Sequence, residues 1–179
     1  MWLQAAPGAA GRIVRDLGTH HGVRRATLVV GDWDALAVIE ADDMASIGAV
    51  LTEVHGIEGV VRTVTAPMVP PDRLGTVGGG FAMGRPPQLT PGDACYVQIR
   101  ATPGSVPMLV ERLAEIEAVS GVAATAGDFD LLVEIRRPWE VASGVILEQI
   151  RSLEGIRSTS THVGYEEPDE DRDQFSAWS

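Results

Sequence analysis

The fold is decided by the stretch Gly127-Asp128-Phe129-Asp130-Leu131-Leu132, because a near copy, Gly31-Asp32-Trp33-Asp34-Ala35-Leu36, stands 96 positions earlier. The same offset aligns Pro7-Gly8 with Pro103-Gly104, and it aligns apolar positions in the segments between them. The correspondence runs without a gap over about 65 positions, which chance matches would not sustain. The sequence therefore predicts two copies of one structural unit.

Two copies divide the chain into four predicted parts. The first repeat spans residues 1–67 and the second spans residues 94–165. Residues 68–93 are rich in Pro and Gly and show no period, so they are predicted to be a linker. Their Gly78-Gly79-Gly80 run lacks the Gly-Lys-Ser/Thr that follows in phosphate loops, which favours a flexible joint. Residues 166–179 are rich in acids and are predicted to be a disordered tail.

The order of secondary structure is clearest in the second copy. Apolar Cys95, Val97 and Ile99 alternate with Tyr96, Gln98 and Arg100, which predicts a strand. The segments that follow are predicted as helix, strand, strand, helix and strand: 106–116, 120–126, 131–135, a helix from Glu140 that Gly155 ends, and 156–163. The first copy repeats this order, with Gly59 closing its second helix. Each copy is therefore predicted to be βαββαβ, the ferredoxin-like split βαβ of the α+β class.

One face of each predicted sheet lacks a cover. Right-handed crossovers put both helices of a copy on one face of a four-stranded antiparallel sheet. The opposite face is also apolar, since both alternating positions of residues 27–30 and 35–39 are largely apolar. The sheet of the other copy would cover this face. The predicted architecture is therefore two ferredoxin-like repeats packed sheet to sheet as a dimeric α+β barrel.

Charge and composition exclude several classes of function. The 179 residues carry a net charge of −11, and the bases do not cluster, so we expect no direct DNA binding and no membrane association. The single Cys95 excludes an intrachain disulfide and a multi-cysteine metal site, and its apolar surroundings predict a buried, inert thiol. No apolar run reaches ~20 residues and no signal peptide is visible, which predicts a cytoplasmic protein. Lys and Asn are both absent, as in GC-rich bacterial coding.

The sequence offers little for catalysis. The four histidines show no metal-ligand spacing, so we expect no metal and no cofactor. No nucleophile stands at a spacing that would pair it with a base, so we expect no enzyme.

The two motifs, at the same spacing in both copies, resemble the effector-binding domain of Lrp/AsnC regulators, also called the RAM domain. The resemblance is carried by the Gly-Asp-aromatic-Asp stretches 31–34 and 127–130 and by residues 59–65 and 155–161. It implies a small-molecule sensor, with an amino acid as effector, that acts in transcription regulation as a homo-oligomer or with an Lrp/AsnC regulator. Such regulators also carry an N-terminal helix-turn-helix domain. Here the first effector-type strand begins at residue 2, so the resemblance implies the sensor part alone, in duplicate.

The candidate ligand-binding residues lie at the two hairpins and in the last strand of each copy. The hairpin aspartates have a structural reading, bonding to their own turn, and a functional one, accepting a ligand ammonium while backbone N–H groups hold its carboxylate. The threonines have a structural reading as strand formers and a functional one as hydroxyl donors. The candidates are Gly31, Asp32, Asp34, Thr63, Thr65, Gly127, Asp128, Asp130, Thr159 and Thr161. Trp33 and Phe129 are expected to be apolar anchors, and this difference makes the two hairpins non-identical.

Two other functions remain open at this level. Folds of this topology also host enzymes such as monooxygenases, and the repeats could form a pure oligomerisation scaffold. An enzyme would need a His or an acid pair projecting into the barrel interior. The sequence instead favours polar groups concentrated at hairpins and strand edges.

Overall fold

A computed structural model describes residues 1–69, 86–89 and 92–166. The first part of the chain forms β1 (Trp2–Ala5), α1 (Ala10–Thr19), β2 (Val23–Val30), β3 (Ala35–Ile39), α2 (Met44–His55) and β4 (Val60–Val64). The second part forms β5 (Cys95–Ala101), α3 (Val106–Ala114), β6 (Val119–Ala124), β7 (Leu131–Ile135), α4 (Trp139–Gly144), the π-helix η2 (Val145–Ile150) and β8 (Ile156–Tyr165). Gly78-Gly79-Gly80 and residues 167–179 of the predicted tail lie outside the described residues.

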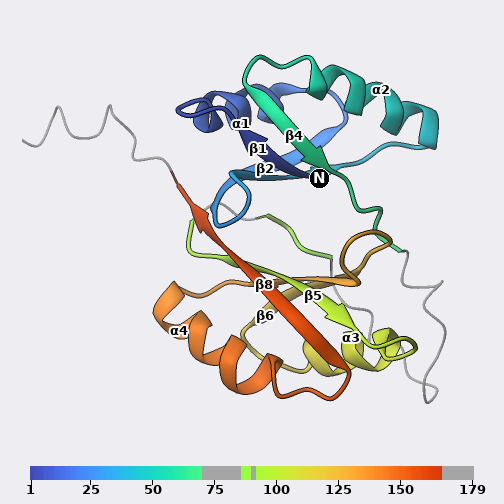
Figure 1. Ribbon diagram of the computed structural model, residues 1–179, viewed down its shortest axis with the longest axis vertical. Coiled ribbons are helices and arrows are strands. Elements are labelled where there is room, and N and C mark those ends of the chain that lie inside the picture. The colour runs from blue at the N-terminus through green and yellow to red at the C-terminus, as the bar shows by residue number, and fades with distance from the viewer. Residues whose placement is uncertain (70–85, 90–91, 167–179) are drawn as a thin grey trace, which may run out of the picture.

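The described strands form one antiparallel sheet with the order β4-β1-β3-β2-β8-β5-β7-β6. Strands β2 and β8 join its two halves through the pairs Leu28–Tyr165, Val29–Gly164 and Val30–Val163. Helices α1 and α2 lie at one end of the molecule and α3 and α4 at the other, with the strands between them (Figure 1). The α+β class with an antiparallel sheet, predicted from the sequence, is confirmed.

The outer edges of the sheet also approach each other. Met68, which follows β4, forms an antiparallel bridge with Thr125, which follows β6. The Val69 N–H donates to the Ala124 carbonyl at 2.8 Å, and the Ala126 N–H donates to the Pro67 carbonyl at 2.9 Å. The segment that follows β4 is therefore linked by backbone hydrogen bonds to the end of β6 and to the residues after it.

The hydrogen-bond register of the first half recurs in the second half with the offset of 96 seen in the sequence. Trp2 pairs with Leu36 in β3 and with Val64 in β4. Gln98 pairs with the equivalent residues of the second half, Leu132 and Ser160. Even the irregularity at the end of β1, between Gln4 and Ala5, recurs between Arg100 and Ala101.

Three apolar clusters fill the part of the chain that the structure describes. One lies between the second-half strands and their helices and includes Cys95, Val97 and Ile99. A second lies between the first-half strands and α1 and α2. A third joins the two halves on the opposite face of the strands, and its buried members are Trp2, Val29, Leu36, Leu89, Ala94, Tyr96, Phe129 and Leu132. Apolar side chains of both halves therefore share one interior.

Several sequence expectations need correction in detail. The helix predicted from Glu140 begins at Trp139 and changes to a π-helix at Val145. Gly155 does not end that helix, because the last helical residue is Ile150. Gly155 has a φ of +96°, and a Cβ there would lie 2.7 Å from the Ser105 Cβ, so close approach to the start of α3 requires the glycine. A glycine after an apolar stripe looks the same in sequence in both situations.

The predicted linker is partly packed. Leu89 is fully buried in the cluster shared by the two halves. The Gln88 N–H donates to the Glu134 Oε2 at 2.9 Å. Residues 86–89 are therefore part of the folded structure and do not act only as a joint.

The thiol of Cys95 is buried in the second-half core, as the sequence predicts. Burial raises the pKa of Cys95 to about 11, and the nearby Asp93 adds to the shift. A thiol in this state is protonated at neutral pH and is a poor nucleophile.

Candidate functional site

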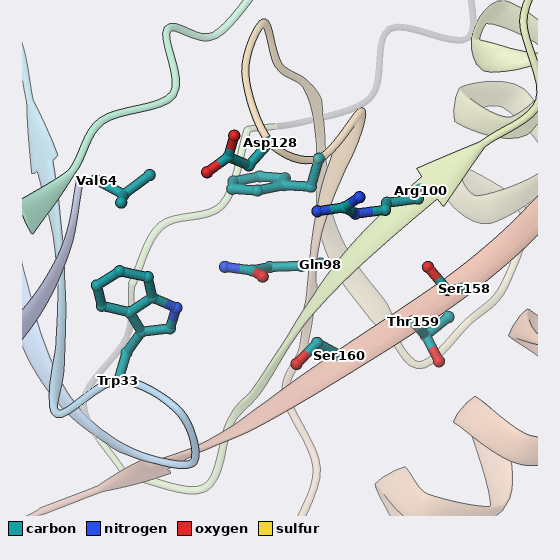
Figure 2. A pocket seen from close by; sticks show the side chains of 9 residues that line it. Trp33, Val64, Gln98, Arg100, Asp128, Ser158, Thr159 and Ser160 are labelled. Carbon is teal, nitrogen blue, oxygen red and sulfur yellow. The ribbon is translucent and has the colours of Figure 1, made fainter.

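A pocket of about 220 Å³ opens where the two halves of the chain meet. Trp33 and Val64 come from the first half and face the second-half strands β5 and β8 across the opening (Figure 2). The pocket is lined by Trp33, Val64, Gln98, Arg100, Asp128, Phe129, Ser158, Thr159 and Ser160.

The polar wall of this pocket follows from strand alternation. Cys95, Val97 and Ile99 turn toward the helices, so the alternate residues of β5 turn toward the other half. Gln98 pairs with Ser160, and Arg100 pairs with Ser158, on the adjacent strand β8. Amide, guanidinium and hydroxyl groups are therefore brought side by side on one face of the sheet.

The remaining walls combine aromatic surface and a carboxylate. Phe129 is only 5% exposed and belongs to the shared core. Trp33 is half-buried against the same core, and the Arg62 guanidinium lies 5.3 Å from the centre of its ring, a cation–π distance. Asp128 and Arg100 are both exposed, so the pocket presents one negative and one positive charge to its contents.

The hairpin aspartates Asp34 and Asp130 hold the fold together. The Ala5 N–H donates to Asp34 Oδ2 at 2.8 Å, and the Ala101 N–H donates to Asp130 Oδ2 at 2.7 Å. Each carboxylate thereby ties its hairpin to the end of the first strand of its half, at the irregularity described above. The structural reading expected each aspartate to bond to its own turn, whereas these two carboxylates accept from the backbone of another strand.

The other predicted ligand residues do not all lie in one place. The pocket brings together two of them, Asp128 and Thr159. Asp32 lies nearby, with its Oδ2 3.5 Å from the Ser160 hydroxyl oxygen. Thr63 hydrogen-bonds instead with His55 of α2. The remaining candidates Gly31, Asp34, Thr65, Gly127, Asp130 and Thr161 do not line this pocket.

Polar side chains also lie deep between the halves. Tyr96 pairs with Glu134 on one side and with His162 on the other, and all three side chains are fully buried. The expectation that polar groups concentrate at hairpins and strand edges is therefore wrong for this row. The sequence did not reveal this buried polar row, because alternation along a strand separates its two faces but does not show which face meets the other half.

His162 is the least satisfied member of this row. Its Nε2 lies 3.5 Å from the Ser160 hydroxyl, and its Nδ1 has no hydrogen-bond partner among the described residues. Burial lowers the pKa of His162, and the charge of Asp32 opposes that shift. The imidazole is therefore neutral at neutral pH. Gly31 makes room for it, since a Cβ on Gly31 would lie 2.6 Å from His162 Nδ1.

The sequence-based list missed Gln98, Arg100, Ser158 and Ser160. One signal was present, because Gln98 and Arg100 are the polar members of an alternating strand whose apolar members face the helices. Polar residues on a face that must be covered by another sheet indicate a polar cavity there.

A family model described as the Lrp/AsnC ligand binding domain matches residues 94–174, which include the strands of the polar pocket wall. Residues 94–174 of this chain are an Lrp/AsnC ligand-binding domain. The Lrp/AsnC match supports a regulatory, ligand-binding role. A search of curated proteins gave no match.

Several solved structures are similar to parts of this chain. TTHA0845 from Thermus thermophilus is 30% identical over 43% of this chain and 99% of its own, with a TM-score of 0.40. AsnC of E. coli is 17% identical over 69% of this chain and 74% of its own, with a TM-score of 0.39. The transcriptional regulator NMB0573 of Neisseria meningitidis, solved with L-Met, is 15% identical over 69% and 72%, with a TM-score of 0.38.

The described part of the chain shows neither a metal-ligand cluster nor a helix that could cross a membrane. Within residues 1–69, 86–89 and 92–166, no three His, Cys, Asp or Glu side chains gather as metal ligands would. The helices of these same segments are all too short or too polar to span a bilayer.

Proposed function

We propose that this chain is a small-molecule sensor whose effector is an amino acid, bound in the pocket between its two halves. The observation that carries the proposal is the presence of Arg100 and Asp128, both exposed, on the wall of one pocket with an aromatic side. An amino acid is a zwitterion with an apolar or polar side chain. Such a ligand matches one cation, one anion and an aromatic surface in a small volume.

Each group of the pocket has a role in this proposal. The Arg100 guanidinium pairs with the ligand carboxylate, and the Gln98 amide donates a further hydrogen bond. The Asp128 carboxylate accepts from the ligand ammonium. The ligand side chain rests against Phe129 and Trp33. A volume of about 220 Å³ suits a small metabolite, since pockets for drug-sized ligands span ~300–1,000 Å³.

The proposed architecture is a tandem duplicate, with ferredoxin-like repeats at 1–67 and 94–165 whose sheets face each other as an α+β barrel. The recurring register and the shared apolar cluster support it. The chain then acts in transcription regulation through assembly, with further copies of itself or with a DNA-binding Lrp/AsnC regulator. The effector changes that assembly because it binds where two halves meet.

The test is calorimetric titration of the chain with each of the twenty amino acids. We expect at least one to bind, and we expect Arg100→Gln and Asp128→Asn each to weaken it by about ten- to hundredfold, the worth of one charge-assisted hydrogen bond. Arg112→Gln, which removes an exposed arginine of α3 outside the pocket, is the matched control and should leave affinity unchanged. Absence of binding by all twenty amino acids would overturn the proposal.

The chain by itself should not bind DNA specifically. Its net charge of −11 and its lack of Lys leave too few cations to neutralise phosphates, which supply most of the non-specific affinity. Fluorescence anisotropy with labelled promoter fragments at ~0.1 M salt should show no sub-micromolar binding. Tight, salt-sensitive binding would contradict this and would indicate that the chain acts on DNA without a partner.

A further inference from the structure

The repeated register identifies the residue that is equivalent to Gln98 in the first half. Trp2 occupies the same position in its ladder, paired with Leu36 and Val64 where Gln98 is paired with Leu132 and Ser160. The two side chains therefore start from equivalent positions in the two halves of the sheet and turn toward the same interior. Their sizes differ greatly, since one carries an amide and the other an indole.

The indole of Trp2 is buried in the apolar cluster between the two halves. Trp2 is 1% exposed, and its ring meets the Phe129 ring edge-on, with centres 6.3 Å apart and planes at 85°. Its ring centre also lies 4.6 Å from that of His162. Phe129 is the counterpart of Trp33, which forms the aromatic wall of the pocket. Trp2 of the first half thus packs against Phe129, the equivalent of the residue Trp33 that lines the pocket.

A second exchange acts in the same direction. Ser158 lines the pocket in the second half, and its counterpart in the first half is Arg62. The Arg62 guanidinium lies over the Trp33 ring rather than leaving that surface free. Gln98 and Ser158 of the pocket therefore correspond to larger side chains in the first half. These are Trp2 and Arg62.

We propose that the chain has a single effector site, because Trp2 fills the space in the first half that is equivalent to the pocket beside Gln98. This inference rests on the proposed function, and it adds that Gln98 is the residue that keeps the pocket open. The two equivalent positions therefore differ in role: Trp2 packs in the apolar interior, and Gln98 lines the ligand pocket. Each chain then binds one ligand molecule, although it contains two copies of the same backbone unit.

The experiment is a calorimetric titration of the full chain with the amino acid that binds best among the twenty. We expect one molecule bound per chain. Two molecules per chain would overturn the single-site inference and leave the proposed function standing. No heat with any of the twenty would overturn the proposed function, and this inference with it.

A pair of variants tests the role of Gln98. Gln98→Trp copies the first-half residue into the second half, so it should abolish measurable binding while the circular dichroism spectrum stays that of the parent. Gln98→Ala is the matched control: it removes the amide and leaves the space, so affinity should fall by no more than about tenfold. Unchanged affinity in Gln98→Trp, or equal loss in both variants, would contradict the assignment of Gln98.

Discussion

Replacement of Trp2 by alanine should lower the free energy of unfolding by about 3–5 kcal/mol, the usual cost of truncating a fully buried aromatic side chain. The indole is 1% exposed and contacts Phe129 and His162 of the other half. Its loss removes apolar burial and leaves a cavity in the apolar cluster that the two halves share. Urea unfolding followed by circular dichroism gives the change directly.

Trp33→Ala is the control for this prediction. Trp33 is half-buried at the pocket rim, so its truncation should cost about 1 kcal/mol, a typical value for a partly exposed position. A loss below about 1 kcal/mol for Trp2→Ala would mean that the halves do not pack through this residue.

The second large effect concerns the hairpin aspartates. The double variant Asp34→Ala with Asp130→Ala should lower the free energy of unfolding by about 2–4 kcal/mol, because each carboxylate accepts one partly buried backbone N–H. The two sites lie in different halves and share no partner, so their contributions should add. Chemical denaturation of the two single variants and the double variant measures both the size and the additivity.

Two further variants separate this role from ligand binding. Asp34→Asn with Asp130→Asn keeps an acceptor oxygen at each site and should recover a large part of the stability. Asp128→Ala removes an exposed carboxylate of the same hairpin and should change stability by less than about 0.5 kcal/mol. If the double alanine variant lost ligand affinity and kept its stability, the aspartates would be ligand contacts rather than hairpin ties.

The fold was accessible from the sequence because its signals are local and occur twice. The alternation at Cys95, Val97 and Ile99 gives β5 its helix-facing side, and the same offset of 96 relates the ladders of both halves. The π-helix at Val145 was not accessible, because an α-helix and a π-helix present nearly the same apolar stripe over so few residues.

The pocket was harder to predict because it depends on which residues of two halves meet. The hairpin motif predicted Asp34 and Asp130 as ligand contacts. A short polar side chain in a turn can accept a hydrogen bond from a backbone N–H as readily as from a ligand, and these two do accept from backbone N–H groups. Gln98 and Arg100 carry no motif. Their importance depends on the covering of one sheet face by the other half, a long-range contact that no local pattern contains.

The β2–β8 ladder and the shared apolar cluster also determine how the molecule comes apart. Trp2 in the first half packs on Phe129 in the second, so opening of either half exposes apolar surface of the other. The chain should therefore melt in one cooperative transition rather than in two steps. A molecule bound between the halves then stabilises both at once, by RT ln(1 + [L]/Kd), and a shift in a single melting curve reports its binding.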